Sequence, residues 1–440
     1  MRIAIIGGGA AGMSAASRIK RLRPNWDVKV FERAAYVSHA PCGVPFYVSG
    51  FVRDLAELCA YDTDFFREKR GIDVHARARV VKVGKGFLEV VENGQENTYE
   101  WDKLLFATGA RANSLNVSYE ELEGVLCVHY IENGEKVKEI AARSEKIVVV
   151  GSGYIGLEMS EALTRLGKRV ILIEKEENPI PDFDPEIGAI LKKVLENKVD
   201  VRFNEEVVSI EGKDRVEKVV TNKGEYECEM VIVAVGEIPN VELAVDLGVK
   251  LGKSGAIETN SKLETSMKSV YAAGDCAETV NIITGEKDWI PLAAPANKMG
   301  YVAGVNIAGY KMEFPGALRS QLTSFYDLEV GKAGLSEKEA IKKGFDPVSA
   351  TIKTKSTARY MPNGEITVKL VADSDGSVLG LQAIGVGVAK RIYAASSLLY
   401  KKSNVKDFFF VDIPYYPPES RVWDPLIVAA RNLFRKLGIP

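Results

Sequence analysis

A short stretch near the N-terminus holds the residue best suited to redox chemistry. Cys42 lies in the run Ser38-His39-Ala40-Pro41-Cys42-Gly43-Val44-Pro45, which predicts a turn bounded by proline and glycine. A single cysteine is usually a small buried apolar residue, whereas an accessible thiolate can attack a disulfide bond. The position of the turn favours the second interpretation, because a glycine-rich strand–turn–helix pattern ends only a few residues before it. We therefore take Cys42 as the candidate redox centre.

The glycine-rich pattern before that turn has the spacing of a dinucleotide site. An Ile-rich segment, 2–6, predicts a buried parallel strand, and a helical pattern follows to about Arg23. A second predicted strand, 27–31, ends at Glu32, an acid 20 residues beyond the last glycine. Glycines let the backbone approach a pyrophosphate at the helix N-terminus, and the acid can accept hydrogen bonds from a ribose. The expected contact residues are Gly7, Gly9, Ala10, Ala11, Gly12 and Glu32.

The same pattern recurs 144 residues further along the chain. A predicted strand at 146–150 leads into Gly151-Ser152-Gly153-Tyr154-Ile155-Gly156, a helix, and a strand that ends at Glu174. One interpretation is a duplication with one inactive copy. Because both copies keep every glycine and the acid, we expect two working nucleotide sites. Two further predicted strands end in motifs of their own, Thr108-Gly109 and Gly274-Asp275.

Bulk properties narrow the class of protein. A chain of 440 residues with 46% hydrophobic and 27% charged residues predicts a globular protein of two to four domains. A net charge of −2 argues against binding to nucleic acid or to an anionic membrane. We see no membrane-spanning or signal segment and no metal site in the sequence. Five cysteines without C-x-x-C spacing predict a reducing, cytoplasmic setting, and the scarcity of Gln and His hints at a thermophile.

These motifs together make the chain resemble the pyridine nucleotide–disulfide oxidoreductase superfamily over essentially its whole length. The resemblance implies an α/β fold with two Rossmann-like dinucleotide-binding domains, for FAD and NAD(P)H, and a C-terminal α+β dimerisation domain. The implied boundaries are 1–112 with 242–314 for FAD, 113–241 for NAD(P)H and 315–440 for dimerisation. In such proteins the Gly-Asp motif binds the ribityl chain, the Tyr of the second motif gates the flavin, and a nearby Glu lines that face. The implied cofactor residues are Thr108, Gly109, Gly274 and Asp275 for FAD, and Gly151, Gly153, Tyr154, Ile155, Gly156, Glu158 and Glu174 for NAD(P)H.

The single cysteine indicates a branch of this superfamily. The glutathione reductase branch carries a Cys-x4-Cys pair at this place, whereas Cys42 has no second cysteine five residues away, because Cys59 is the next cysteine. The pattern S-x-x-x-C-G-x-P resembles coenzyme A disulfide reductase, NADH oxidase, NADH peroxidase and persulfide or sulfur reductases. Ala10 stands where oxidases and peroxidases carry His, which favours coenzyme A disulfide reductase with a Cys42–S–S–CoA intermediate. The alternatives are a sulfur, polysulfide or persulfide reductase, an NADH oxidase, or an electron-transfer flavoprotein resembling ferredoxin or rubredoxin reductases, which would not need Cys42.

The resemblance also implies a substrate site and a homodimer. Coenzyme A, as substrate or product, carries three phosphates, so its binding site needs cations. The positions that match the coenzyme A-binding residues of these reductases are Ser14, Arg18, Arg21, Ser38, Arg70 and Asn297. Arginines on a helix are otherwise an ordinary solvated face. In the C-terminal part, Tyr360 and Tyr415 match tyrosines that reach the partner's site, although Glu419 replaces a second aromatic of that motif. Interface packing is the alternative role of both tyrosines.

Overall fold

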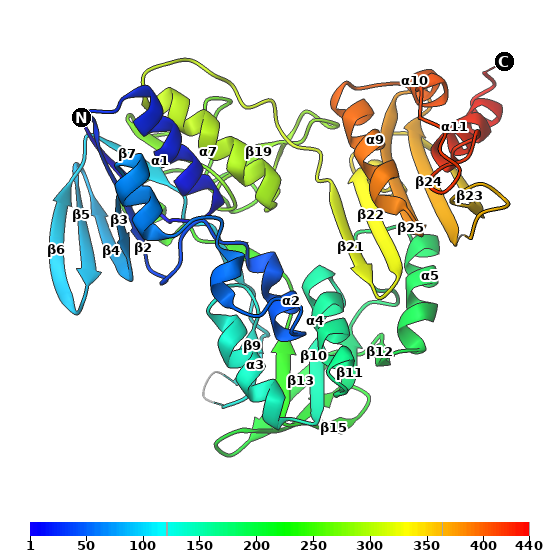
Figure 1. Ribbon diagram of the computed structural model, residues 1–440, viewed down its shortest axis with the longest axis horizontal. Helices are drawn as coiled ribbons and strands as arrows, with labels where there is room; N and C mark the ends of the chain where they lie inside the picture. The colour runs from blue at the N-terminus through cyan, green and yellow to red at the C-terminus, as the bar shows by residue number, and fades with distance from the viewer. Residues whose placement is uncertain (120–121, 363, 440) are drawn as a thin grey trace.

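The computed structural model describes residues 1–119, 122–362 and 364–439. Three five-stranded sheets organise it, and each lies in a separate region of Figure 1. The N-terminal part forms the region at the upper left, the middle of the chain forms the region below, and the C-terminal part forms the region at the upper right. Between the second and third regions the chain returns to the first, where it adds β18 and α7.

The first sheet is parallel and has the strand order β18-β7-β1-β2-β3. Its central strands are rich in Ile, Val and Leu and are largely buried, as a parallel sheet covered by helices requires. Helices α1 and α7 pack against each other beside it. The predicted strand–turn–helix–strand unit is therefore present. The elements are β1 (Arg2–Ile6), α1 (Ala10–Leu22), β2 (Asp27–Glu32), β3 (Asp73–Ala76), β7 (Lys103–Phe106), β18 (Val270–Ala272) and α7 (Ala293–Ile307).

The second sheet repeats this design with the order β12-β11-β10-β16-β9. All of its strand pairs are parallel, and β10 carries the second glycine motif at its C-terminal end. The elements are β9 (Val125–Cys127), α3 (Asn133–Arg143), β10 (Lys146–Val150), α4 (Tyr154–Arg165), β11 (Arg169–Glu174), α5 (Pro185–Glu196), β12 (Asp200–Phe203) and β16 (Met230–Val233).

Each of these two regions also carries a small antiparallel sheet that the sequence pattern did not reveal. One consists of β4 (Ala78–Gly84), β5 (Phe87–Glu92) and β6 (Gln95–Glu100), the other of β13 (Val207–Gly212), β14 (Val216–Thr221) and β15 (Glu225–Glu227). The two regions are joined where β8 (Ala110–Ala112) pairs with β17 (Glu237–Pro239), just before α6 (Glu242–Leu247). A short hairpin, β19 (Thr279–Val280) and β20 (Lys287–Asp288), follows β18.

The third sheet is antiparallel and has the order β21-β22-β25-β24-β23. Helices α9 and α11 cover one face, and the other face turns toward α5 and the second sheet. The strand and helices predicted near 365–371, 387–402 and 424–437 are all present. The elements are β21 (Gln321–Phe325), β22 (Leu328–Gly334), α8 (Glu337–Lys342), β23 (Pro347–Lys355), β24 (Glu365–Asp373), β25 (Val378–Gly385), α9 (Val388–Tyr400), α10 (Val405–Phe410) and α11 (Pro425–Lys436).

Candidate active site

A cavity of about 1230 Å³ opens where the first two regions and the edge of the third sheet meet. Cys42 lines it together with both glycine motifs, so residues more than a hundred positions apart share one space. The expected site residues that line it are Gly7, Gly9, Ala10, Ala11, Glu32, Cys42, Thr108, Gly109, Gly153, Tyr154, Ile155, Glu158, Gly274 and Asp275.

The glycine turns are shaped by contacts that exclude a side chain. Gly7 has φ +107, and a Cβ there would lie 2.1 Å from the carbonyl oxygen of Ala107. A Cβ at Gly12 would lie 1.9 Å from the Gly7 carbonyl oxygen, so the helix packs tightly on the strand. By contrast, a Cβ at Gly9 would meet nothing within 4 Å, which leaves its backbone open toward the cavity. The second motif has the same three environments at Gly151, Gly156 and Gly153.

The two acids that end β2 and β11 are bound to their own glycine turns. Glu32 accepts the backbone N–H of Gly8 at 2.7 Å and is 8% exposed. Glu174 accepts the backbone N–H and the hydroxyl of Ser152, both at 2.7 Å, and is 6% exposed. Glu32 lines the cavity, whereas Glu174 is not among its lining residues. Each carboxylate therefore fixes a turn, and a ribose would share oxygens that already accept hydrogen bonds.

Asp275 provides a direct test of whether the cavity fits FAD. Its Oδ1 atom is buried and has no hydrogen-bond partner within the described part of the chain. Burial and the negative charge of Glu237 raise the pKa of this carboxyl to about 6, against the opposing effect of His129. A buried acceptor left unpaired is costly, and a hydroxyl of a bound ribityl chain would satisfy it. Together with the open backbone at Gly9, this acceptor makes the residues fit the cofactor.

Cys42 lies in a 3₁₀ turn, η1 (Pro41–Gly43), that leads into α2 (Val44–Val48). The residue is exposed at the cavity, while protein packs against its other side. Burial raises the pKa of the Cys42 thiol, and the negative charge of Glu158 raises it further. The helix that follows has only five residues, so its dipole offers the thiolate little compensation for desolvation and the nearby carboxylate.

One side of α4 is hydrogen-bonded to the edge strand β21. Tyr154 Oη lies 3.2 Å from Gln321 Oε1, and the Thr323 hydroxyl donates to Glu158 at 2.6 Å. One turn further, the backbone N–H of Tyr326 donates to Glu161 at 2.8 Å. Burial raises the pKa values of both Tyr154 and Glu158. Sequence patterns did not point to the β21 residues, because nothing in a short alternating strand shows which helix it meets.

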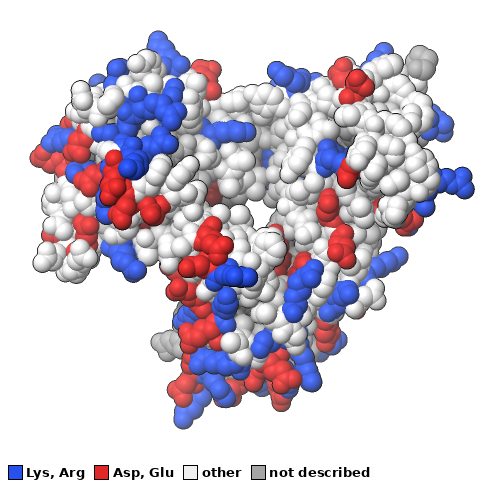
Figure 2. Space-filling view, in the orientation of Figure 1, with Lys and Arg blue, Asp and Glu red and all other residues white. Residues whose placement is uncertain are grey.

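None of the six expected coenzyme A residues lines the cavity. Arg18 stacks on the ring of Tyr301 of α7 at 4.6 Å, and its buried Nε has no partner among the described residues. Asn297 lies one turn before Tyr301 on α7 and is exposed. Figure 2 shows Lys and Arg side chains gathered over this part of the molecule, at the upper left. Of the remaining four expected coenzyme A residues, Ser14 and Arg21 lie on α1, and Arg70 follows η3 (Phe65–Lys69). The fourth, Ser38, donates its backbone N–H to the Gly8 carbonyl.

Tyr360 and Tyr415 lie in the third region and outside the cavity of their own chain. Their hydroxyl oxygens are 3.0 Å apart, and the residues are 72% and 49% exposed. The hydrogen bond from Tyr360 raises the pKa of Tyr415.

The remaining cysteines and histidines add little to this site. Cys276 is fully buried beside the first sheet, in agreement with a core role, and all five cysteines are free thiols. His39 lines the cavity, and its buried Nδ1 has no partner among the described residues. No described helix is both long and apolar enough to cross a membrane. No group of metal-ligating residues occurs in the described ranges.

Comparison with known proteins identifies the family. The family model "Pyridine nucleotide-disulphide oxidoreductase" matches residues 1–300, and its dimerisation domain matches residues 320–425. The chain is 49% identical over 437 residues to an NAD(P)H sulfur oxidoreductase (CoA-dependent) of Pyrococcus furiosus, covering 98% of this chain and 99% of the relative. It is 48% identical over 437 residues to an NAD(P)H coenzyme A polysulfide/persulfide reductase of Pyrococcus horikoshii, covering 98% of each. A Staphylococcus aureus coenzyme A disulfide reductase is more distant, at 28% identity over 96% of this chain and 97% of its own.

A solved structure agrees with these relatives. The NAD-dependent persulfide reductase from A. fulgidus superposes with a TM-score of 0.96 at 35% identity, covering 100% of this chain and 84% of that one. The predicted fold class, the FAD and NAD(P)H cofactors and the single-cysteine branch are thereby confirmed, and the thermophile bias fits the Pyrococcus relatives. The chain belongs to the pyridine nucleotide-disulphide oxidoreductase family and is an FAD-dependent NAD(P)H oxidoreductase.

Proposed function

We propose that this protein is a coenzyme A-dependent NAD(P)H reductase of polysulfide or persulfide sulfur, with Cys42 as its nucleophile. The observation that carries the proposal is the exposure of Cys42 in the cavity that both glycine motifs line. Relatives of nearly half-identical sequence bear names of this kind, which reverses the order expected from the sequence. Reduction of coenzyme A disulfide becomes the second candidate, since the relative of that name is only 28% identical.

Both candidates use the same thiol chemistry. The Cys42 thiolate attacks the S–S bond of the substrate, forms a mixed disulfide with one sulfur and releases the other as a thiol or hydrosulfide. Bound FAD would supply the two-electron chemistry that links NAD(P)H oxidation to reduction of the disulfide. The balanced reaction converts R–S–S–R′, NAD(P)H and H⁺ into R–SH, R′–SH and NAD(P)⁺. When R is coenzyme A and R′ is hydrogen, the second product is hydrogen sulfide.

The protein residues control access and protonation. We assign Tyr154 as the gate over the nicotinamide side of the cavity and Glu158 as a lining residue held by Thr323. Because burial and Glu158 raise the pKa of Cys42, the surrounding protein favours the protonated thiol. Two electrons break the S–S bond of the mixed disulfide and leave two thiolates, so the Cys42 thiolate takes up a proton to reach the form that the protein favours.

Coenzyme A would bind along α1 and α7. The phosphates need cations, which Arg18, Arg21 and Arg70 would supply, and Arg18 Nε has no hydrogen-bond partner among the described residues. Ser14, Ser38 and Asn297 complete the predicted set. Ser38 lies four residues before Cys42, so this set extends along the chain toward the Cys42 turn.

The active unit would be a homodimer in which Tyr360 and Tyr415 serve the partner's cavity. Their exposure and their distance from the cavity in their own chain support this arrangement. The β8–β17 link supports the proposed domain boundaries, 1–112 with 242–314, 113–241, and 315–440. Five free thiols fit the proposed cytoplasmic location.

The proposal is tested by measuring the rate of NADH oxidation with two substrates. The first is polysulfide, with and without added coenzyme A, and the second is coenzyme A disulfide. We expect polysulfide turnover to require both coenzyme A and Cys42. The Cys42→Ser variant should still bind FAD and accept electrons from NADH. Cys59→Ser is the matched control, since Cys59 is the next cysteine and lies outside the main cavity, and it should retain activity.

Three other outcomes would redirect the assignment. A higher kcat/KM with coenzyme A disulfide than with polysulfide would restore the second candidate. Equal turnover of polysulfide without coenzyme A would refute the coenzyme A dependence. Full electron transfer to protein acceptors by Cys42→Ser would indicate an electron-transfer flavoprotein.

A further inference from the structure

A row of polar side chains crosses the third sheet on the face that meets the second region. Directly paired residues of neighbouring strands project to the same face of a sheet. The strand register places one such residue in each of the five strands, and from β21 to β23 the row reads Gln321, Lys332, Gln382, Lys369 and Thr351. The opposite face is apolar and covered by helices. Polar side chains buried between the third sheet and the second region are costly unless they are paired, so their partners have to be identified.

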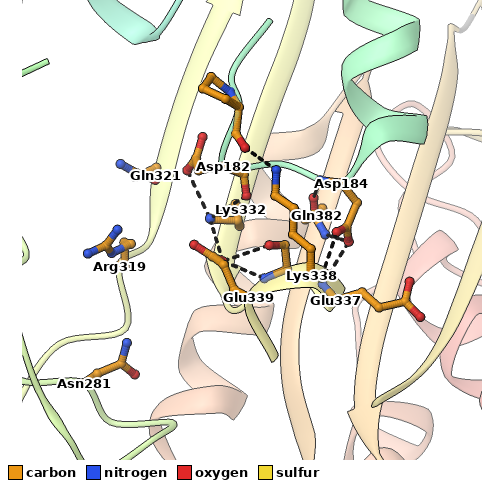
Figure 3. Close-up of polar contacts among 12 residues, drawn as sticks. Asp182, Asp184, Asn281, Arg319, Gln321, Lys332, Glu337, Lys338, Glu339 and Gln382 are labelled. Carbon is orange, nitrogen blue, oxygen red and sulfur yellow. Dashed lines mark hydrogen bonds and ion pairs between the residues drawn. The ribbon is translucent and has the colours of Figure 1, made fainter. Parts of the chain in front are cut away.

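Lys332 is the most deeply buried cation of this row. Its side chain is 0% exposed, and Nζ lies 3.0 Å from a carboxylate oxygen of Asp182 and 3.0 Å from one of Glu339 (Figure 3). Nζ also donates to the backbone carbonyl of Asp182 at 3.1 Å. Burial alone would raise the pKa of Glu339, but Lys332 and hydrogen bonds from Ser336 hold it below its usual value. The Glu339 carboxylate is therefore held in its ionised form beside Lys332.

Lys369 continues the same network toward α5. Its side chain is 2% exposed, and Nζ lies 3.0 Å from Asp184 and 2.6 Å from each of Glu186 and Glu337. Burial would lower the pKa of Lys369, but these hydrogen bonds raise it. Asp184 also accepts a hydrogen bond from the side-chain amide of Gln382, as Figure 3 shows. The loop from 180 to 184 is thus bound to the sheet through its two acids, Asp182 and Asp184, and the first turn of α5 is bound through Glu186.

The network reaches the start of α4 by two routes. Through the sheet, Lys332 lies opposite Gln321 in the strand register, so the two side chains project side by side from one face, and the Tyr154 hydroxyl donates to Gln321 Oε1 at 3.2 Å. Through the loop, the Asp182 carbonyl and carboxylate bind Lys332, while the backbone N–H of Ile180 donates to the Ser152 carbonyl at 3.1 Å. Ser152 and Tyr154 both belong to the second glycine motif. Both routes therefore hold the same turn of the chain against the third sheet.

We infer that Lys332 is a positioning residue for Tyr154, which it holds through Gln321 and through the Asp182 loop at the entrance to the nicotinamide side of the cavity. This inference rests on the gating role assigned to Tyr154 in the proposed function. A well-packed apolar row would join the two regions at least as strongly, because buried ion pairs rarely add net stability. What the charged row adds is a single fixed geometry between the sheet and the glycine motif.

The test compares Lys332→Met with Lys353→Met in the FAD-loaded dimer. Lys353 lies on the same sheet and pairs with Glu365 at 2.7 Å, but it is 64% exposed, so it controls for loss of a lysine. The measurement is the rate of flavin reduction by NADH in a single anaerobic turnover, well below the melting temperature. We expect Lys332→Met to slow this step by roughly tenfold, because misplacement of a positioning group is felt at the reacting atoms. Lys353→Met should leave it within about twofold.

A double-mutant cycle with Tyr154→Ala separates positioning from general damage. If Lys332 acts through Tyr154, Lys332→Met should add little in the Tyr154→Ala background. Gln321→Leu, which leaves no unpaired buried charge, is the second variant and replaces Lys332→Met if that chain does not fold. Gln321→Leu should slow flavin reduction in the native background and have little effect in the Tyr154→Ala background.

The inference alone would be overturned if the separate effects of Lys332→Met and Tyr154→Ala multiply in the double variant, or if Lys332→Met reduces its flavin at the normal rate. If Lys332→Met does not fold, a normal rate in Gln321→Leu has the same consequence. An unchanged rate in Tyr154→Ala would overturn the gating role in the proposed function and the inference with it.

Discussion

The composite active site is open to a complementation experiment between two damaged chains. One chain carries Cys42→Ser and the other carries Tyr415→Phe. Tyr415 is 49% exposed, and its hydroxyl contacts that of Tyr360 at 3.0 Å, so loss of the hydroxyl removes one surface hydrogen bond. The backbone around it is held independently, because the Ser420 hydroxyl donates to the Pro414 carbonyl at 2.8 Å. We therefore expect both chains to fold, bind FAD and dimerise normally.

The expected recovery follows from two-fold symmetry. If Tyr415 serves the partner's cavity, a mixed dimer has one doubly damaged site and one site with both residues intact. Independent sites then give about half of the native activity in the purified mixed dimer. Random assortment of equal amounts makes about half of all dimers mixed, so the unfractionated sample should recover about a quarter of native activity above the parental background.

The assay is disulfide- or polysulfide-dependent NADH oxidation by mixed dimers isolated through two different affinity tags. Each parent alone, taken through the same refolding, is the control. If Tyr415→Phe is impaired but the mixed dimer has only the mean activity of its parents, Tyr415 acts within its own chain and the composite site is refuted. If Tyr415→Phe is fully active, the phenol has no catalytic part and packs at the interface.

Three further predictions concern charges. Glu158→Gln removes a negative charge near Cys42, so the pKa of Cys42 should fall and its alkylation by iodoacetamide should begin at lower pH; an unchanged pH profile would show that burial alone sets the pKa. In the native protein, Arg391 is 2% exposed and lies 2.6 Å from Asp424, so Asp424→Asn leaves a buried guanidinium without its counter-charge. The free energy of unfolding in urea should fall by about 3–5 kcal/mol, and a loss below about 1 kcal/mol would contradict this prediction. Glu174 should make kcat/KM higher with NADH than with NADPH, and a strong NADPH preference would show that Glu174 does not meet the ribose.

The sequence by itself predicted those parts of the fold that short-range rules determine. Each glycine motif specifies a turn that only glycine tolerates, as the close approaches at Gly7 and Gly12 show, and the flanking apolar runs specify the strands. The cysteine turn follows the first such unit directly, so its proximity to the nucleotide site was also predictable. The small antiparallel sheets at 78–100 and 207–227 were missed, because their charged, half-exposed strands have no apolar run to mark them.

The tertiary structure decided what depends on residues far apart in the chain. Lys332 looks like an ordinary surface lysine in sequence; it is buried because strand register and an opposing loop bring Asp182 and Glu339 to it. The pKa of Cys42 likewise depends on Glu158, which another domain supplies. Periodicity reports which face of an element is apolar, but not which element it meets. Desolvation and Coulomb interactions act through space, so the charges that tune this site could be read only from the folded chain.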